Sequence, residues 1–256
     1  MIILSADFII CFDPEATDWK YIYSAPNISS KHFFGTDSLG RDLFARTLQG
    51  SRTTLMIGFV SALISLFIGI SVGLISGFYE GNIDKFLMRL VDILYSIPYI
   101  FFIILLVTFI EKNIILTFVA IGLINWLDLA KIIRGQTLNI KSKAYICGAI
   151  AAGASNFRII FKYILPNLMS TIIIYISILL PQVILAETFL SFLGLGIQEP
   201  ETSLGILISD GANNITFAWW TLAFPTLCLT ILLFYFNFIS DRFNSALLLK
   251  ETRNGR

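Results

Sequence analysis

The sequence has little charge and few of the residues that build reactive sites. Only 14% of its 256 residues are charged, whereas soluble domains usually carry about 25%. A single histidine, His32, and three cysteines that lie far apart cannot supply a histidine cluster, a disulfide framework or a zinc site. The formal net charge of +1 argues against a nucleic-acid partner. We therefore expect no metal, no cofactor and no catalytic residue in this chain.

A phosphate-binding loop is also missing. The nearest match is GTDSLGRD, Gly35 to Asp42, which resembles a Walker A loop but places Arg41 at the lysine position and Asp42 at the hydroxyl position. A carboxylate at that point would repel phosphate. The pattern H-E-x-x-H of zinc proteases does not occur either, so we expect that the chain is not an enzyme.

Hydrophobic residues are abundant, at 56% of the chain, and the mean hydropathy is +0.81. A compact soluble protein could not bury this much apolar surface, so the surrounding solvent must be partly lipid. A helix that crosses ~30 Å of hydrocarbon needs roughly 20 mostly apolar residues. The sequence therefore predicts an all-α integral membrane protein with five clear spans. They cover residues 53–78, 93–110, 114–130, 168–187 and 217–240.

Prolines, glycines and polar residues delimit these spans. Pro98 breaks the second span, and residues 111–113 form a tight polar break before the third. The apolar run 168–197 is too long for one crossing, because 30 helical residues would reach roughly 45 Å. We expect Pro181 and Gly194 to interrupt it, so that TFLSFLGLGI, residues 188–197, forms an interfacial or re-entrant piece.

The N-terminal stretch MIILSADFIICF is too short to span a membrane and contains Asp7. It lacks the basic region and cleavage site of a signal peptide, and resembles the back half of a transmembrane helix whose front half is missing. We divide the chain into this truncated span with an extracytoplasmic segment (1–52), a transmembrane domain (53–245) and a tail (246–256).

The distribution of Lys and Arg sets the predicted orientation. Placing residues 131–168 in the cytoplasm gives the inner loops twice as many Lys and Arg residues as the outer loops. The C-terminus then lies in the cytoplasm, and residues 13–52 lie outside.

A few polar or small residues lie within the spans. We interpret Asp128 and Lys131 as a snorkelling i,i+3 pair. Glu187 must face protein or a water-filled cavity, and we favour a structural hydrogen bond to the following turn over contact with substrate. Gly69, Gly73 and Gly77 repeat at four-residue spacing, which predicts close helix packing on one face.

The segment AYICGAIAAGASNFRIIFKYILPN, residues 144–167, lies between two spans. Its first half is built from small residues, Gly153 interrupts it, and a basic amphipathic helix that ends at Pro166 is predicted to follow. An interfacial helix lying on lipid and an extra span are alternatives, the second disfavoured by Arg158 and Lys162. We favour a cytoplasmic docking surface, because small residues let a partner approach closely.

This segment resembles the EAA loop in membrane subunits of ATP-binding-cassette importers. That loop begins with an acidic residue and two alanines, continues with a glycine four residues later, and closes with I-L-P. Gly148 and Ala149 occupy the alanine positions, Gly153 the glycine and residues 164–166 the close, whereas Cys147 stands at the acidic position.

Three further stretches resemble the dipeptide and oligopeptide permeases, and with the EAA-like segment they extend the resemblance over roughly residues 32–246. HFFGTDSLGRDLFART is similar to a block of that subfamily in which proline usually stands where this chain has Phe33. AKIIRG, residues 130–135, and ILAETFLSFLGLGIQEPETSLG, residues 184–205, are similar to two more. The matches point to the second, C-type permease of the pair.

The resemblance implies a type I importer transmembrane domain in the bacterial inner membrane, which carries peptides. It also implies a heterodimer with a homologous permease, two cytoplasmic ATPase subunits that hydrolyse ATP, and an extracytoplasmic binding protein. Residues 141–167 would form the cytoplasmic coupling loop. The residues expected to couple to the ATPase are Tyr145, Gly148, Ala149, Gly153, Arg158 and Pro166.

Other functions remain open at this point. Similar permeases carry nickel chelates or glutathione, and the binding protein, which is not in this chain, usually selects the substrate. A stand-alone channel or membrane scaffold would explain the composition equally well, although not the long matching blocks. An intramembrane enzyme has no set of residues to support it.

Overall fold

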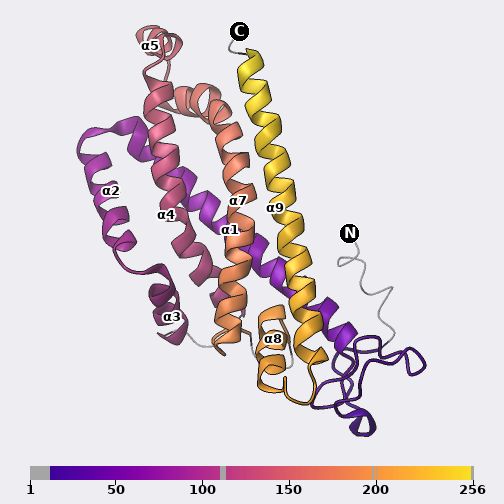
Figure 1. The fold of residues 1–256 in the computed structure, drawn as a ribbon. Helices are drawn as coiled ribbons and strands as arrows, with labels where there is room; N and C mark the ends of the chain where they lie inside the picture. Colours follow the sequence, from indigo (N-terminus) through magenta and orange to yellow (C-terminus); the bar gives the residue numbers. More distant parts are fainter. Residues whose placement is uncertain (1–11, 110–113, 198, 200, 255–256) are drawn as a thin grey trace. The chain divides into compact units, whose positions relative to one another are not determined.

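The structure, a computed structural model, describes residues 12–109, 114–197, 199 and 201–254. Helices are the regular elements of this part of the chain, whose β pairing is limited to two isolated bridges. The predicted all-α class is therefore confirmed (Figure 1). The helices are α1 (Leu43–Tyr79), α2 (Gly81–Tyr95), α3 (Tyr99–Phe109), α4 (Ile114–Lys141), α5 (Ala144–Ala151), α6 (Asn156–Arg158), α7 (Leu165–Phe192), α8 (Leu204–Asn213) and α9 (Trp220–Asn254), with a short 3-10 turn at Trp19–Tyr21.

Three helical stretches of the described residues are long and apolar enough to cross a membrane by length and composition. They are Leu43–Tyr79 and Asn156–Phe192, with 37 residues each, and Trp220–Arg242, with 23 residues. The second predicted span is divided at Pro98 into α2 and α3, because proline cannot donate the backbone hydrogen bond that would continue the helix.

The chain forms two compact units, and five of its helices, α1, α3, α4, α7 and α9, contribute to both. Unit 1 contains Met1–Phe59, Ile104–Phe118 and Pro181–Phe236; unit 2 contains Val60–Ile103, Val119–Leu180 and Asn237–Arg256.

Unit 2 is built on close packing of α1 against α4. An added Cβ at Gly69 would lie 2.9 Å from the Leu129 side chain. At Gly73 it would lie 2.7 Å from Ile133, and at Gly77 it would lie 2.7 Å from Thr137. Real Cβ atoms do not approach so closely, so each glycine is required by the contact. The predicted packing role of this glycine stripe is confirmed.

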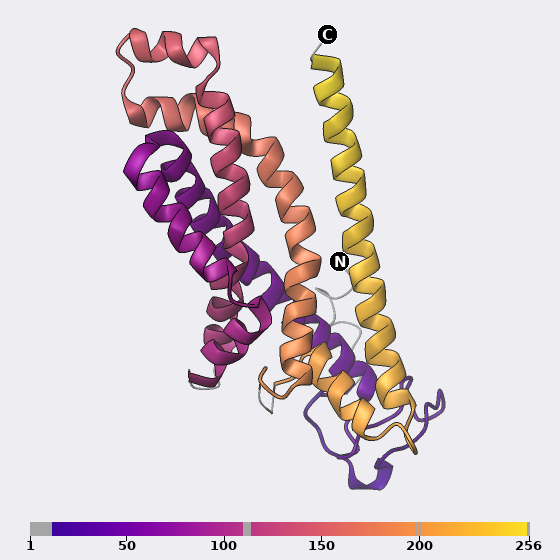
Figure 2. The ribbon, with the colours of Figure 1, turned by 60° about the vertical axis from the view of Figure 1, so that its left-hand side comes forward.

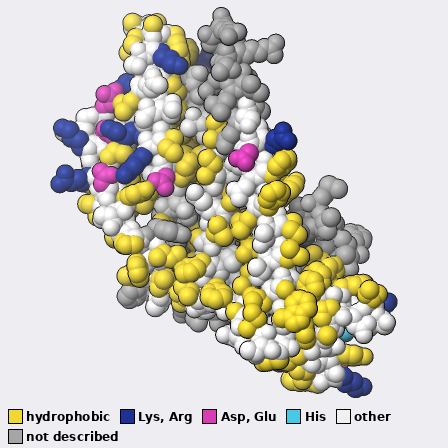
Figure 3. Space-filling model, in the orientation of Figure 1, with side chains coloured by type: hydrophobic (Ala, Val, Ile, Leu, Met, Phe, Trp, Pro, Cys, Tyr) yellow, Lys and Arg dark blue, Asp and Glu magenta, His cyan; other side chains and the backbone are white. Residues whose placement is uncertain are grey.

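Ion pairs join α2 to α4 within unit 2, where the two helices run side by side (Figures 1 and 2). Asp84 pairs with Arg134, and Asp92 pairs with Lys131 at 2.8 Å. Figure 3 shows charged side chains gathered over α2 on this face. The predicted pairing of Lys131 with Asp128 is wrong, because Lys131 reaches across to α2 instead.

Unit 1 holds the beginning of α1, the preceding loop, α8, the end of α7 and the beginning of α9. Asp42 starts α1, since its side chain accepts a hydrogen bond from Ala45 N at 2.8 Å. Phe34 of the loop stacks on Phe224 of α9 with ring centroids 4.2 Å apart. These contacts order a loop that has little regular secondary structure.

The end of α7 differs from the expectation. Pro181 lies inside the helix, and α7 continues to Phe192 instead of breaking near Glu187. It ends where Gly194 adopts φ +74°, with Leu195 N donating to Leu190 O at 2.9 Å. This is a Schellman motif, which glycine favours. The expected piece 188–197 therefore belongs partly to α7, and the separate short helix is α8.

Two expectations fall on residues outside the described part of the chain. They are the truncated span, of which residues 1–11 are not described, and the polar break at 111–113.

Candidate functional site

The small-residue segment forms a short helix that lies across the end of α4 (Figure 2). α5 ends in a second Schellman motif: Gly153 has φ +77°, and Ala154 N donates to Ala149 O at 3.0 Å. A side chain at Gly153 would be strained in this conformation, although nothing lies within 4 Å of an added Cβ. Gly153 therefore fixes the sharp turn after α5.

The basic half of the segment is continuous with the next span. Ser155 caps α6, a π-helical turn follows at Ile159–Ile164, and α7 begins at Leu165. The predicted helix end at Pro166 is wrong, since Leu165 N bonds to Ile160 O and the helix continues. Proline has no N–H to contribute, and it lies in the first turn of α7 beside a wider turn, where its ring is tolerated.

Buried isoleucines anchor this segment to unit 2. Ile146 and Ile164 are fully buried and Ile159 is 1% exposed, all within one core cluster that also contains residues of α1 and α4. Lys141, at the end of α4, donates to Phe78 O at 2.6 Å and to Glu80 Oε1 at 2.8 Å. A force applied to α5 would therefore be transmitted to the helices of unit 2.

The face of the segment that points away from unit 2's core is apolar and exposed to solvent. Tyr145 is 46% exposed and Ile150 45%, while Phe157 and Phe161, with ring centroids 4.3 Å apart, are 71% and 52% exposed. We call these four residues the apolar pad. Of the other residues expected here, Gly148, Arg158 and Pro166 are exposed and Ala149 is partly buried.

Arg134 and Asp84 set the electrostatics between α2 and α4. The hydrogen bonds from Arg134 hold the pKa of the Asp84 carboxyl below its ordinary value, and the same contact raises the pKa of Arg134. Both groups are therefore charged over the physiological range.

In unit 1, Glu187 is fully buried and surrounded by hydroxyl groups. Ser191 Oγ donates to its Oε1 at 2.7 Å, Thr188 lies 3.5 Å from Oε2, and Ser203 and Thr54 also bond to it. Ser203 caps α8 and Thr54 belongs to α1, so this carboxyl connects three helices. The other intramembrane acid singled out, Asp128, is exposed on α4.

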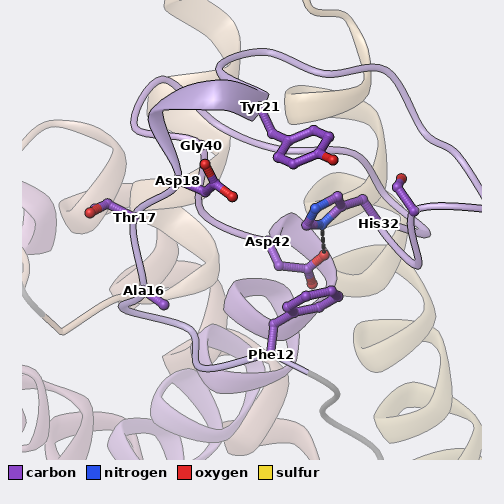
Figure 4. A pocket seen from close by; sticks show the side chains of 9 residues that line it. Phe12, Ala16, Thr17, Asp18, Tyr21, His32, Gly40 and Asp42 are labelled. Carbon is purple, nitrogen blue, oxygen red and sulfur yellow. Dashed lines mark hydrogen bonds and ion pairs between the residues drawn. The ribbon is translucent and has the colours of Figure 1, made fainter.

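A pocket of about 380 Å³ lies in the loop before α1 (Figure 4). Its centre is His32, whose Nδ1 is 2.8 Å from Asp42 Oδ2 and whose ring stacks on Phe12 at 4.7 Å. His32 lies in the loop, ten residues before Asp42, and sequence spacing alone could not reveal this pairing. One carboxylate thus both caps α1 and holds the imidazole.

Two arginines of the same loop and of α1 share two carboxylates. Arg41 Nε is 2.7 Å from Asp37, and its Nη2 is 2.9 Å from Glu199. Arg46 lies 3.7 Å from each of the same acids. Sequence reasoning missed this cluster: the spacing of Asp37 and Arg41 is visible, but Glu199 lies 158 residues from Arg41.

The chain matches a protein family over residues 69–250, which include α5 and the apolar pad. The family is described as the binding-protein-dependent transport system inner membrane component.

Curated relatives are similar over nearly the whole chain. The oligopeptide transport system permease protein OppC of Haemophilus influenzae is 48% identical over 242 residues, covering 94% of this chain and 78% of the relative. The dipeptide transport system permease protein DppC of Bacillus subtilis is 41% identical, covering 86% and 69%. The glutathione transport system permease protein GsiD of Pectobacterium atrosepticum is 34% identical, covering 94% and 80%.

A solved structure shares the fold. A chain of the inward-facing MetNI methionine ABC transporter superposes with a TM-score of 0.63 at 20% identity, covering 80% of this chain and 97% of that one.

Proposed function

Because the chain belongs to the family of binding-protein-dependent transport system inner membrane components, we propose that it is the permease subunit of an ATP-driven peptide importer in a bacterial inner membrane. The observation that carries the proposal is the family match over residues 69–250, together with relatives whose names specify oligopeptide or dipeptide transport. The chain provides the path, and ATP is hydrolysed by partner subunits.

The proposed assembly contains a homologous permease, two cytoplasmic ATPase subunits and an extracytoplasmic binding protein. The apolar pad is a suitable contact for an ATPase, since exposed aromatic groups of this kind are typical of protein interfaces. The open space at Gly148 lets a partner surface approach the backbone of α5.

The coupling mechanism follows from the anchoring of α5. ATP binding draws the two ATPases together and moves α5, and the buried Ile146, Ile159 and Ile164 pass that movement to α4, α7 and α1. The bundle then shifts between two packings, driven by the different affinities of the ATPases for ATP in each state.

In the membrane, the proposed spans are the predicted stretches 53–78, 93–110, 114–130, 168–187 and 217–240, which fall in α1, α2 with α3, α4, α7 and α9. The C-terminus is cytoplasmic. The excess of Lys and Arg in the inner loops supports this orientation. The extracytoplasmic side then carries the loop before α1 and the cluster of Arg41 and Arg46.

Glutathione is a second candidate substrate, since one relative at 34% identity carries the name of a glutathione permease. Glutathione is itself a peptide, so the permease path need not differ greatly. A channel or scaffold that needs no ATPase is the alternative of a different class.

Co-purification and transport test the proposal. The tagged chain, expressed with its partner permease and ATPases, should bring down both ATPases, and vesicles containing the complex should take up labelled peptide when ATP and loaded binding protein are supplied. Phe157→Ser with Phe161→Ser should reduce ATPase recovery, whereas Phe86→Ser, an equally exposed residue of α2, should not. A complex that purifies without ATPase would favour the channel or scaffold.

A further inference from the structure

Arg46 is a buried arginine whose guanidinium group has no hydrogen-bond partner on its Nε–Nη2 edge among the described residues. It lies in the first turns of α1 and is 1% exposed. Nearly all buried polar atoms in proteins are hydrogen-bonded, and an unpaired charged donor is costly. An unsatisfied buried guanidinium therefore requires an explanation.

The two unsatisfied atoms define the shape of what is missing. The N–H groups of Nε and Nη2 lie on the same side of the planar guanidinium and point in parallel, which matches the two oxygens of one carboxylate. Arg134 of unit 2 uses these same two atoms to bind both oxygens of Asp84, each at 2.5 Å. The empty edge of Arg46 has the form of a carboxylate site.

Neighbouring acids balance the charge of Arg46 without filling this edge. Asp37 Oδ2 and Glu199 Oε1 are 3.7 Å from Arg46, beyond hydrogen-bond distance, and both are already bound by Arg41 at 2.7 and 2.9 Å. Asp210 contributes only through longer-range attraction. Arg41 thus has hydrogen-bond partners for both Nε and Nη2, whereas the same two atoms of Arg46 have none among the described residues.

We propose that the Nε–Nη2 edge of Arg46 is a carboxylate-binding site that is filled during the transport cycle. Two sources can supply the carboxylate. One is the free α-carboxylate of the transported peptide, and the other is Glu199, whose side chain is 54% exposed and could turn from Arg41 to Arg46. The first source rests on the proposed function, whereas the second requires only that unit 1 rearranges.

The present conformation is closed around Arg46, so a carboxylate reaches it only when the packing of unit 1 changes. A permease that alternates between two packings provides such a change. The site would then hold its ligand in one state and release it in the other, which is what a transport path requires.

The test compares one peptide with its C-terminally amidated form. The unmodified binding protein is saturated with either peptide, as verified by its own titration, and the ATPase activity of the complex in nanodiscs is measured. Because the binding protein is the same throughout, a change in the acid-to-amide ratio between variants reports on the permease. Activity of the wild-type complex with the free-acid peptide tests the proposed function separately.

If the peptide supplies the carboxylate, the wild-type complex has higher ATPase activity with the free-acid peptide than with the amide. Arg46→Lys then lowers this acid-to-amide ratio about tenfold, whereas Glu199→Gln leaves the ratio unchanged. If Glu199 supplies it, both variants lower the activity about equally with either peptide and leave the ratio unchanged. Arg52→Lys, an exposed arginine of the same helix, is the control and should match wild type in both measures.

Wild-type activity and ratio in Arg46→Lys would overturn the site. If Arg46→Lys fails to assemble, the wild type and Glu199→Gln decide the question. The site would also be overturned if the acid and amide peptides stimulated the wild-type ATPase equally and Glu199→Gln had wild-type activity.

Discussion

Arg134 on α4 binds Asp84 on α2 through two parallel hydrogen bonds, Nε to Oδ1 and Nη2 to Oδ2, each 2.5 Å long. The Asp84 side chain is 13% exposed and that of Arg134 is 34% exposed, so the pair is shielded only in part from water. Ser76 of α1 also donates to Asp84. The pair therefore joins three helices of unit 2 at one carboxylate.

Asp84→Asn should loosen this junction. The amide keeps the shape but loses the charge and one of the two acceptors, so we expect a loss of about 1–2 kcal/mol in the free energy of unfolding. The unfolding temperature of the detergent-purified complex should fall by a few degrees. Asp128→Asn, at an exposed acid of α4, is the matched control. Equal unfolding temperatures for the two variants would contradict the assignment.

The same pair predicts how stability depends on pH. The pKa of Asp84 is lowered in the folded protein, so its contribution is complete above the ordinary Asp value of about 3.9 and is lost as pH falls towards the lower folded value. The difference in unfolding temperature between wild type and Asp84→Asn should be constant near neutral pH and should narrow in acid. A difference that stayed constant down to pH 3 would show that Asp84 is not the group responsible.

Much of the fold could be predicted from the sequence, because the determining signals are local. Apolar runs predicted the helices, Pro98 predicted the break between α2 and α3, and the spacing of Gly69, Gly73 and Gly77 predicted a packing face. Gly153 was recognised as a turn because its position in a motif and its effect on the backbone are both local properties.

The errors concern partners that are distant in sequence. Lys131 has an acid three residues away, yet it pairs with Asp92 on another helix. Arg41 meets Glu199 only because α8 and the end of α7 fold back to the loop before α1. The prediction of a helix end at Pro166 is wrong for a different reason. The neighbouring π-turn, which accommodates the proline, leaves no clear signature in the sequence.

The proposed docking of an ATPase at α5 can be tested separately from folding by substitutions at two glycines. Gly148 and Gly135 both have open space where a Cβ would be added, and both lie in helices, so leucine at either position should leave the chain intact. Gly148→Leu should obstruct a partner at α5 and reduce ATPase recovery and peptide uptake by about tenfold, whereas Gly135→Leu should not. Quantitative pull-down from membranes, with equal permease levels checked by immunoblot, measures this. Normal ATPase recovery with Gly148→Leu would exclude a close approach at that position.

Glu187 supports a prediction about the packing of unit 1. Its carboxyl accepts hydrogen bonds from hydroxyls on α1, α7 and the start of α8, so removing it leaves buried donors without an acceptor. Glu187→Ala should therefore destabilise the complex by about 2–4 kcal/mol, and Glu187→Gln, which retains one oxygen, should cost less. Glu201→Ala, at an exposed acid before α8, is the control for removal of charge alone.

Hydrogen exchange locates the effect of Glu187→Ala within the molecule. Faster exchange should appear at the N–H groups of α8, because Leu204 N bonds to Thr54 Oγ1, and Thr54 is one of the hydroxyls released from Glu187. Exchange in α5 should remain as in wild type, since no residue of α5 contacts this carboxyl. If α5 and α8 exchanged faster to the same extent, the loss would be global, and Glu187 would not be the local connection between α7, α8 and α1 that its hydrogen bonds indicate.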